Sequence, residues 1–553
     1  MDIGEMQRRL SVKASKEPDH KFGDLFNLIC RTDWLLQAHD HVASNAGSKT
    51  AGCDGITMGD FDQDLDHQTQ VLRGQLKGGE FQPHPVRRVR IPKGDGKVRP
   101  LGIPSIRDRI VQEALRMALE PIFEADFCQE SYGFRPDRRT MDAIAHLKVY
   151  TMETMKYFWV IEGDIKSYFD TINHRRLMKL LGRRIEDRKA LGLIQDFLSA
   201  GVMERKQFKD TPAGAPQGGI LSPLLANVYL HELDEFMLRY TGLVREEKTG
   251  RRKEGLANFA YARYADDFVV LCSGKEDEAL GMRDELHEFL ANRLRLKLSL
   301  EKTKVTHLNR GFVFLGFEMK RGRSGKTGRK VTRILIPEES AKKHRDVLKS
   351  IFSSDTDDSV VTKLQAANRV VAGWCRYYQH TSKPGARFGR LGYETFWLAA
   401  HWLARKYRRS MPQVMRRFRR AGSLGTDEAR LALHTDFKRI GYRTRPRPFL
   451  NPYIDGEVIR ETLPDETPWI GNETRKGAGD TRIRIIRRDN FMCQWEGCGK
   501  EVTLETAEVD HMRPRCDFGW KWLADHDENL WTLCPEHHQI KTENDRERES
   551  RVH

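Results

Sequence analysis

Two adjacent carboxylates, Asp266 and Asp267, are the strongest chemical signal in the chain. They lie between the segments FAYAR (259–263) and FVVLC (268–272), so the pattern predicts two strands joined by a tight hairpin with both carboxylates at its tip. Neighbouring carboxylates repel each other, and a divalent cation such as Mg²⁺, which prefers hard oxygen ligands, is their natural compensation. Solvated turns also contain Asp-Asp pairs, so this pair alone does not establish a metal site.

A third carboxylate, Asp164, follows the apolar segment 158–161, which is predicted to form a buried strand. At the end of that strand, Asp164 is expected to face the hairpin of Asp266 and Asp267 across one sheet. Three carboxylates gathered in this way can hold two Mg²⁺ ions roughly 3.5–4 Å apart. One ion would activate a 3′-hydroxyl and the other would stabilise a leaving pyrophosphate, which is what in-line phosphoryl transfer needs.

A second candidate metal centre lies near the C-terminus. Cys493 and Cys498 are followed by Cys534 and His537, and this spacing can close a tetrahedral Zn²⁺ site. A purely structural zinc ribbon would show the same four residues. Cys516 fits neither this set nor any other, and no role is assigned to it.

The composition narrows the class of protein and of partner. The chain has 553 residues and a net charge of +16, which favours a polyanion: nucleic acid first and an anionic membrane surface second. The length predicts several structural units, and 39% hydrophobic residues exclude wholesale disorder. The scattered cysteines do not fit a secreted disulfide scaffold, the N-terminus has no apolar signal segment, and the most apolar helical stretch, 396–404, is too short to span a bilayer. These features favour a soluble, intracellular protein.

The elements that must position the carboxylates form a mixed α+β pattern with an antiparallel sheet. A basic hairpin over 86–104 is suited to covering phosphates, and strands are predicted over 311–319 and 331–336. Helices are predicted over the ranges 25–43, 105–127, 142–155, 220–238, 341–352, 361–380, 393–409 and 411–421. The last two helices are dense in arginine. The Pro-rich stretch 443–476 is expected to be a linker or strap.

Taken in order, the motifs KGDGKVRPLGIP, GFRP, GDIKSYFDTINH, GAPQGGILSPLLANVYLHELD, RYADDFVVL, SLEKTK and FLGF resemble the reverse transcriptases encoded by group II introns, over most of residues 50–320. The resemblance implies a right-hand polymerase whose fingers and palm, with an antiparallel palm sheet, span 86–335 after an N-terminal extension with the start of the fingers over 1–85. A helical thumb, or maturase X domain, is expected over 336–425, and a DNA-binding region or linker over 426–478. An HNH endonuclease domain is expected over 479–553.

The resemblance also implies roles for single residues of the polymerase. Asp164, Asp266 and Asp267, with Ile165 beside them, match the Mg²⁺ site. Four residues match dNTP contacts: Lys93 and Arg99 at the fingertips, Phe169 below the sugar, and Gln217 in the nucleotide and template pocket. At the Phe169 position, a ring excludes a ribose 2′-hydroxyl. Lys302 matches the region that binds the primer. Ala215 stands where the family more often has threonine.

The helical region after residue 340 is similar to the maturase thumb. AGWCRYY (372–378) resembles the family's GWANYY-like signature, and its aromatic side chains could stack on bases or fill a core. Clustered arginines repel one another unless a polyanion neutralises them, so RNA binding is expected here. The residues expected to bind RNA are Arg376, Arg405, Arg408, Arg409, Arg416, Arg417, Arg419 and Arg420.

The C-terminal segment VDHMRP (509–514), together with ENLWTL (528–533), resembles an HNH endonuclease of the ββα-metal type. The resemblance implies His511 as the general base that activates water, Asp510 and His538 as ligands of one divalent ion, and Asn529 as the residue that fixes the backbone around His511. The structural Zn²⁺ site is then Cys493, Cys498, Cys534 and His537, with His537 in place of the usual last cysteine.

These features predict a multifunctional group II intron-encoded protein. It would assist splicing of its intron RNA, nick double-stranded target DNA and extend the cleaved end with dNTPs on the RNA template. No membrane partner is expected, and the expected location is the bacterial cytoplasm, at the nucleoid when DNA is bound, with an organellar origin as the other possibility. Two alternatives are a splicing-only RNA-binding maturase, and a reverse transcriptase of the retron, diversity-generating or CRISPR-linked kind.

Overall fold

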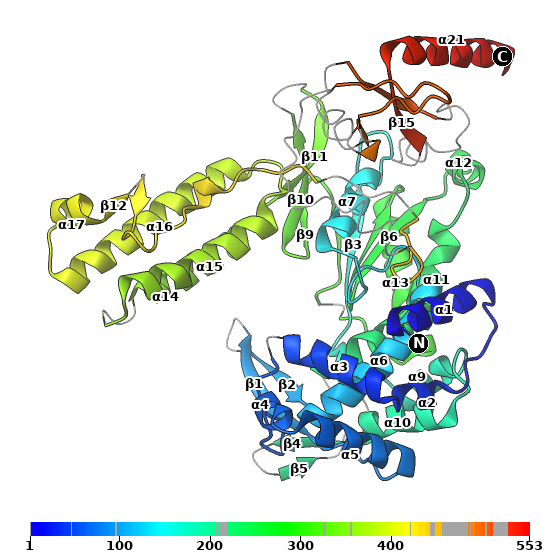
Figure 1. Cartoon of the computed structure of the whole chain (residues 1–553), viewed down its shortest axis with the longest axis vertical. Coiled ribbons are helices and arrows are strands. Elements are labelled where there is room, and N and C mark those ends of the chain that lie inside the picture. Colours follow the sequence, from blue (N-terminus) through cyan, green and yellow to red (C-terminus); the bar gives the residue numbers. More distant parts are fainter. Residues whose placement is uncertain are drawn as a thin grey trace. The chain divides into compact units, whose positions relative to one another are not determined.

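The computed structural model describes residues 2–552 except 46, 94–96, 205–206, 210–213, 215–217, 300, 325–327, 354–356, 421, 443–447, 456–484, 487, 490, 504–505 and 513–528. The chain divides into two compact units, residues 1–467 and 468–553 (Figure 1). None of the described helices is long and apolar enough to cross a membrane.

A four-stranded antiparallel sheet with the order β6-β7-β3-β8 lies at the centre of the first unit. Its strands are β3 (Trp159–Asp164), β6 (Phe259–Tyr264), β7 (Asp267–Cys272) and β8 (Lys304–His307). Because side chains alternate along a strand, the sheet has two buried faces. Ile161 and Val270 pack into one hydrophobic core, whereas Val160 and Val269 pack into another. Strands β6 and β7 are therefore almost continuously buried, in line with the apolar pattern of 259–272, whereas the edge strand β8 has no buried residue.

Helices cover both faces of this sheet. The long helices α6 (Ile106–Asp126), α11 (Ser222–Thr241) and α13 (Glu276–Leu294) contribute to the first core, and α7 (Thr140–Tyr150) contributes to the second. The Ser105 hydroxyl caps α6 by accepting a hydrogen bond from the Asp108 amide. The remaining helices of this part are α8 (Tyr168–Thr171), α9 (His174–Leu181), α10 (Arg188–Ser199) and α12 (Arg245–Lys253).

The N-terminal region is helical and joins the same core. Its helices are α1 (Ile3–Lys16), α2 (Leu25–Ile29), α3 (Thr32–Ser44), α4 (Met58–Asp62) and α5 (Leu65–Gly78). The buried Trp34 of α3 donates a hydrogen bond from Nε1 to the Ala114 carbonyl of α6. A second sheet, with the order β2-β1-β4-β5, contains the predicted basic hairpin as β1 (Val86–Lys93) and β2 (Lys97–Ile103), followed by β4 (Val202–Glu204) and β5 (Gln207–Lys209).

A three-stranded sheet and a group of helices follow. The strands are β9 (Phe312–Phe314), β10 (Phe317–Arg323) and β11 (Lys330–Leu335); the helices are α14 (Glu338–Ser353), α15 (Val360–Tyr378), α16 (Pro384–Tyr407) and α17 (Met411–Phe418) (Figure 1). The short pair β12 (Arg419–Arg420) and β13 (Ser423–Leu424) and the 3₁₀ turn η1 (His434–Asp436) complete the region.

Two expectations about this region are wrong. The single strand predicted over 311–319 is a hairpin, because Leu315 and Gly316 take left-handed φ values of 48° and 73° and reverse the chain between β9 and β10. The helix predicted over 411–421 ends at Phe418, where the chain extends into β12.

Part of the predicted linker is a strap on the first unit. Beyond η1, the Tyr442 hydroxyl donates to Asp142 Oδ1 at 2.6 Å and the Phe449 amide donates to Gln129 Oε1 at 2.7 Å. Asn451 Nδ2 reaches the Ser11 hydroxyl at 2.9 Å. The described residues 448–455 are therefore bound to the body of this unit.

In the described part of the second unit, the antiparallel strands β14 (Glu508–His511) and β15 (Leu530–Leu533) precede α21 (Pro535–Val552). A small core of Ile486, Val502, Ala507 and Leu533 surrounds the buried Cys493 and Cys534.

Candidate functional site

The central sheet brings the three predicted carboxylates to one edge. Asp164 ends β3 and lies directly opposite Asp267, the first residue of β7. Tyr264 of β6 also pairs with Asp267, so Ala265 and Asp266 form the tip of the hairpin. Directly opposed residues of antiparallel strands lie about 4.5–5.5 Å apart at their Cα atoms. The backbone therefore places Asp164 and Asp267 opposite each other, with Asp266 next to them at the tip of the hairpin.

The three carboxylates remain accessible from solvent. Asp267 is exposed, and Asp164 and Asp266 are half-buried. Lys302 Nζ lies 3.0 Å from Asp164 Oδ2, and both side chains are open to water. An exposed ion pair of this kind contributes only about 0–1 kcal/mol, so the lysine can leave when a stronger cation binds. Ile165 is buried and forms a β-bridge with Leu298, which fixes the backbone just beyond Asp164.

The hairpin tip is held by the buried guanidinium of Arg263, the first residue of the RYADDFVVL motif, for which the sequence indicated no role. Nη1 donates to the Ala265 carbonyl and to Asn227 Oδ1, both at 2.9 Å, and Nη2 donates to the Ser131 hydroxyl at 2.8 Å. The carboxylate of Asp234 on α11 accepts from Nε at 2.7 Å. Burial would lower the pKa of Arg263, but the Asp234 carboxylate outweighs it and holds that pKa above its ordinary value. The guanidinium therefore stays charged.

The GFRP loop (133–136) packs against the hairpin turn at Ala265. A Cβ atom at Gly133 would lie 2.2 Å from the Ala265 nitrogen, so only glycine fits this approach. Asn227 Nδ2 donates to the Gly133 carbonyl at 2.9 Å. The next residue, Phe134, is 46% exposed with a left-handed φ of 59°, and its ring meets Phe169 edge to face at 6.4 Å.

Phe169, the predicted sugar contact, sits on the short helix α8. Its neighbour Tyr168 is buried and donates a hydrogen bond to the Ala226 carbonyl at 2.6 Å, which anchors the helix to α11. The Phe169 ring itself is only half-buried. Gly214 packs on α8, because a Cβ atom there would lie 2.8 Å from the Phe169 carbonyl oxygen.

Several other predicted nucleotide contacts lie in parts of the chain that the structure describes only in part or not at all. Lys93 and Arg99 lie on the β1–β2 hairpin, where their backbones pair with Lys97 and Ile91; their side chains lie outside the described part of the chain. Gln217 and Ala215 also lie outside the described residues. Their neighbour Gly218 is described, and it approaches the Gly102 carbonyl of β2 so closely that a Cβ atom would lie 2.4 Å away.

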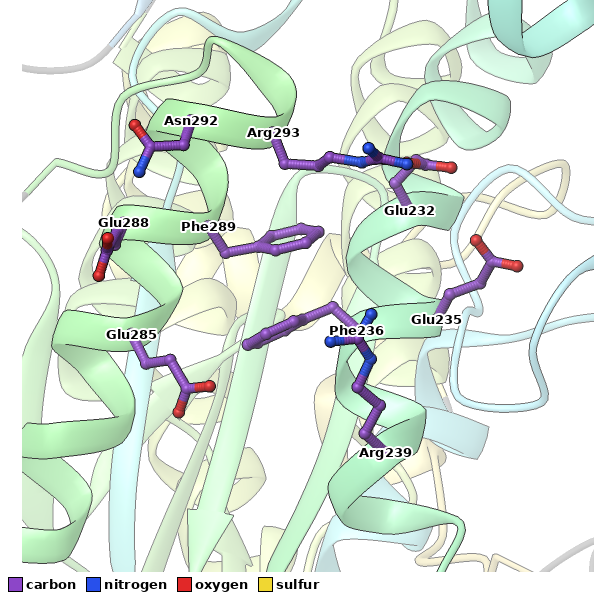
Figure 2. Close-up of a pocket in the computed structure, with 9 residues that line it drawn as sticks. All are labelled: Glu232, Glu235, Phe236, Arg239, Glu285, Glu288, Phe289, Asn292 and Arg293. Carbon is purple, nitrogen blue, oxygen red and sulfur yellow. The ribbon is translucent and has the colours of Figure 1, made fainter.

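A cavity of about 500 Å³ lies between α11 and α13, away from the carboxylates (Figure 2). The rings of Phe236 and Phe289 stack at 4.3 Å in this cavity, and glutamates and arginines surround them. None of Asp164, Asp266 and Asp267 lines it. The three predicted metal ligands therefore lie at the sheet edge and not in this cavity.

Two of the signature aromatics of the 372–378 segment, Trp374 and Tyr378, pack into a core, whereas Tyr377 is 38% exposed. Trp374 stacks on His344 at 4.5 Å with an interplanar angle of 13°. The hydroxyls of Tyr377 and Tyr378 donate to the carbonyls of Leu315 and Gly316, at 2.6 and 3.0 Å. Of the two roles left open for these rings, packing is the one observed, and it ties α15 to the β9–β10 turn. The predicted arginines, in contrast, are all exposed: Arg376, Arg405, Arg408, Arg409, Arg416, Arg417, Arg419 and Arg420.

In the second unit, Cys493, Cys498, Cys534 and His537 converge. Their candidate ligand atoms all lie within 4.8 Å of one another. His537 Nδ1 is 3.1 Å from Cys534 Sγ and 3.8 Å from Cys493 Sγ. Zn–S bonds of about 2.3 Å in a tetrahedral site place two sulfurs ~3.8 Å apart. The four donors therefore fit one zinc ion.

The other four predicted residues of this unit also come together. Asp510 and His511 end β14 opposite Trp531 and Leu530 of β15. His538 Nε2 on α21 lies 3.8 Å from Asp510 Oδ2, and the Met512 amide donates to the Asn529 carbonyl at 2.6 Å. Burial raises the pKa of Asp510, but hydrogen bonds from His511 outweigh it, so this pKa lies below its ordinary value. Asp510 is therefore ionised and suited to a cation. Cys516 lies outside the described residues.

Two ranges of the chain match known protein families. Residues 91–319 match the family described as reverse transcriptase (RNA-dependent DNA polymerase). Residues 341–422 match the group II intron, maturase-specific domain. The C-terminal unit lies outside both matched ranges.

Three relatives show how far the similarity extends. Protein YkfC of Escherichia coli is 41% identical over 360 residues, which cover 62% of this chain and 94% of that protein. The group II intron-encoded protein LtrA of Lactococcus lactis is 35% identical over 364 residues, 57% of this chain and 60% of LtrA. The nuclear intron maturase 1, mitochondrial, of Arabidopsis thaliana is 26% identical over 398 residues, 55% of each chain.

Proposed function

The chain belongs to the family of group II intron-encoded reverse transcriptases and maturases, and from this premise we propose that it carries three activities. It extends a DNA 3′ end on intron RNA, assists splicing of that RNA, and nicks double-stranded target DNA. The reverse transcriptase fold is α+β and implies use of a divalent metal, and the maturase domain implies binding of group II intron RNA.

The proposed polymerase activity rests on one observation: Asp164 lies directly opposite Asp267 in the sheet, and Asp266 is the neighbour of Asp267. These carboxylates, with the backbone at Ile165, would hold two Mg²⁺ ions. Bound there, the ions supply charge stabilisation to the attacking and leaving oxygens of phosphoryl transfer. Hard, accessible oxygen donors at a single sheet edge suit this cation.

The protein's own residues would position the substrates. Lys93 and Arg99 on the β1–β2 hairpin neutralise the triphosphate of the dNTP. The half-buried ring of Phe169 excludes a ribose 2′-hydroxyl, and Gln217 lines the nucleotide and template pocket. Lys302, paired with Asp164, lies where a primer end would arrive, and it can exchange its carboxylate partner for a phosphate.

A right-hand polymerase is the architecture that we assign to these parts. The N-terminal extension and the start of the fingers are residues 1–85, and fingers and palm are 86–335, with β6-β7-β3-β8 as the palm sheet. The thumb, or maturase X domain, is 336–425, and 426–478 is a DNA-binding region or linker. The exposed arginines of the thumb are proposed to bind the phosphates of intron RNA.

The third activity rests on the second unit, 479–553, as an HNH endonuclease. It is supported by the approach of His538 to Asp510 and by the four zinc donors. His511 would take a proton from water, Asp510 and His538 would hold a divalent ion, and Asn529 holds the backbone beyond His511. The zinc ion would brace β14, β15 and α21.

A splicing-only maturase is the main alternative, and a retron, diversity-generating or CRISPR-linked reverse transcriptase is the other. A pure RNA binder needs none of the three gathered carboxylates, whereas all three are present here. The bacterial relatives favour action in a bacterial cytoplasm, at the nucleoid when DNA is bound.

One substitution tests the proposal. Asp266→Ala should abolish dTTP incorporation on poly(rA)/oligo(dT) while group II intron RNA is bound as before. Continued synthesis by this variant would contradict the metal assignment. Loss of both activities with an unchanged melting temperature would contradict the separation of polymerase and maturase surfaces.

A further inference from the structure

The outward face of α16 carries a stripe of aromatic rings. The opposite face of this helix is buried through Phe388, Leu391 and Trp402. On the outward face, Tyr393, Trp397 and His401 follow one another at intervals of four residues, which places them on successive turns of one helix face. These three residues are called the aromatic stripe.

The rings of the aromatic stripe contact one another. Tyr393 meets Trp397 edge to face with centroids 6.2 Å apart, and Trp397 meets His401 at 6.1 Å with an interplanar angle of 40°. Trp397 is half-buried against the core, whereas Tyr393 and His401 are exposed. The stripe is therefore a continuous, laterally fixed ring surface and not three independent side chains.

Such a face is unusual for a helix that lies on a surface. Outward helix faces are normally charged or polar, and aromatic residues have lower helix propensity than the straight-chain polar residues that could replace them. Tyr393 is 68% exposed, the highest exposure among the large apolar side chains of the described chain. Neither packing nor helix formation accounts for a ring at this position.

Cationic groups stand at both ends of the aromatic stripe. Arg390 lies one turn before Tyr393 and is 62% exposed at its side chain, where it also contacts Glu394. Arg405 lies one turn after His401, and Arg408 follows at the end of the helix; both are exposed. Rings flanked by cations are the combination that binds nucleic acid, because the rings stack on bases and the cations contact phosphates.

We propose that the aromatic stripe is a stacking platform for unpaired bases of the intron RNA. The inference rests on the proposed maturase function and adds to it the kind of RNA that this face recognises. Bases inside a duplex are stacked on one another and closed to side chains, whereas bases of loops and single strands can stack on aromatic rings. The matched maturase-specific domain, 341–422, contains the whole stripe, and the flanking arginines supply the charge complementary to RNA.

The salt dependence of RNA affinity distinguishes base stacking on the aromatic stripe from phosphate binding by the arginines. A side chain that neutralises a phosphate contributes to the slope of log affinity against log salt, because it releases counterions. A ring that stacks on a base contributes affinity without changing that slope. The two kinds of contact can therefore be told apart in the full-length protein.

The test measures binding of fluorescein-labelled oligo(U) and of an RNA duplex by anisotropy over a KCl series. Tyr393→Ala and Trp397→Ala should each weaken oligo(U) binding by about 5- to 150-fold, the range measured for loss of one stacked base. The salt slope and the duplex affinity should stay unchanged. Tyr393→Phe keeps the ring and should bind as the parent does. Arg408→Gln should instead lower the slope by about one.

Each other outcome contradicts the platform. Unchanged oligo(U) binding by Tyr393→Ala, in a protein that still binds intron RNA through its arginines, would refute the stripe and leave the proposed function standing. A change in sedimentation with unchanged RNA affinity would identify a contact with a second copy instead. A parent protein that binds neither oligo(U) nor intron RNA would refute the maturase proposal itself. Because Tyr393 is so exposed, its variants should keep the parent's melting temperature.

Discussion

Arg263 and Asp234 form an ion pair in which neither side chain is accessible to solvent. Nε of Arg263 lies 2.7 Å from Oδ1 of Asp234, and Nη2 lies 2.5 Å from Oδ2, so the pair is bidentate. The rest of the guanidinium is bonded to Ser131, Asn227 and the carbonyl of Ala265, the residue before Asp266. A planar group with several fixed donors suits this task, whereas a lysine ammonium does not. The pair therefore links α11 to the turn that carries two of the proposed metal ligands.

Arg263→Lys should lower polymerisation and raise the Mg²⁺ concentration that it needs. The single ammonium cannot hold Asp234, Asn227, Ser131 and Ala265 together, so the turn loses its support. Changes to groups that orient metal ligands typically cost about 10- to 100-fold in metal affinity or activity. The measurement is the rate of dTTP incorporation on poly(rA)/oligo(dT) across a MgCl₂ titration.

A matched control comes from another buried arginine. Arg184 donates to the carbonyls of Ala14 and Glu17 and pairs with Asp126 at 3.0 Å, away from the carboxylates. Arg184→Lys should lower the melting temperature without changing the Mg²⁺ requirement. Equal Mg²⁺ curves for both variants would show that Arg263 only stabilises the fold.

Gly133→Ala should displace the hairpin turn at Ala265 by a steric clash from the GFRP loop. The added Cβ would meet the backbone nitrogen of Ala265 at 2.2 Å, and a backbone atom cannot move aside as a flexible side chain can. Overpacking of this kind typically costs about 1–3 kcal/mol in the free energy of unfolding, and polymerisation should fall with it. A Cβ atom added at Gly281 on α13 would meet no neighbouring part of the chain within 4 Å, so Gly281→Ala should stabilise the protein by roughly 0.5–1 kcal/mol. Equal stability of the two variants in urea unfolding would refute the close approach.

The sequence predicted that Asp164 and the Asp266-Asp267 hairpin share one sheet, but it did not predict the residues that support the hairpin. Asp164, Asp266 and Asp267 each follow or precede an apolar strand, so a single sheet was expected to gather them, and its strand register does so. Arg263 and Asp234 are separated along the chain and look like surface charges. Only the fold shows that both are buried and paired.

Aromatic residues were harder still to interpret. Trp374 and Tyr393 both lie in amphipathic helices and both have arginines nearby. The structure packs the first among other rings and exposes the second. The difference depends on which helix face meets the core, and helices with apolar residues on two faces leave that ambiguous in sequence. The turn at Leu315 and Gly316 was missed for a related reason, since a left-handed leucine has no clear sequence signal.

Phe169→Ala should relax the choice between deoxyribonucleotides and ribonucleotides. The half-buried ring contacts Phe134 at 6.4 Å and Tyr168 at 5.4 Å, and its removal opens space where a 2′-hydroxyl would otherwise clash. The ratio of UTP to dTTP incorporation on poly(rA)/oligo(dT) should rise by at least tenfold, equivalent to about 1.4 kcal/mol of discrimination. Phe134→Ala leaves the Phe169 ring in place, and its smaller effect on the same ratio is the control. An unchanged ratio in Phe169→Ala would rule out a steric gate at this position.

His511→Ala and Cys534→Ser should separate nicking from zinc binding in the second unit. His511 is not among the four converging donors, whereas Cys534 Sγ lies 3.1 Å from His537 Nδ1 within that set. The histidine variant should therefore lose nicking of supercoiled plasmid and keep its zinc, measured by metal analysis of the purified full-length chain. The cysteine variant should lose zinc and then nicking, because the core around Cys493 and Leu533 depends on the metal.

Both variants should retain dTTP incorporation, since the proposed polymerase ligands belong to the other unit. Zinc loss from His511→Ala would mean that His511 is itself a zinc ligand, and nicking by the zinc-free cysteine variant would mean that the metal does not support the nuclease.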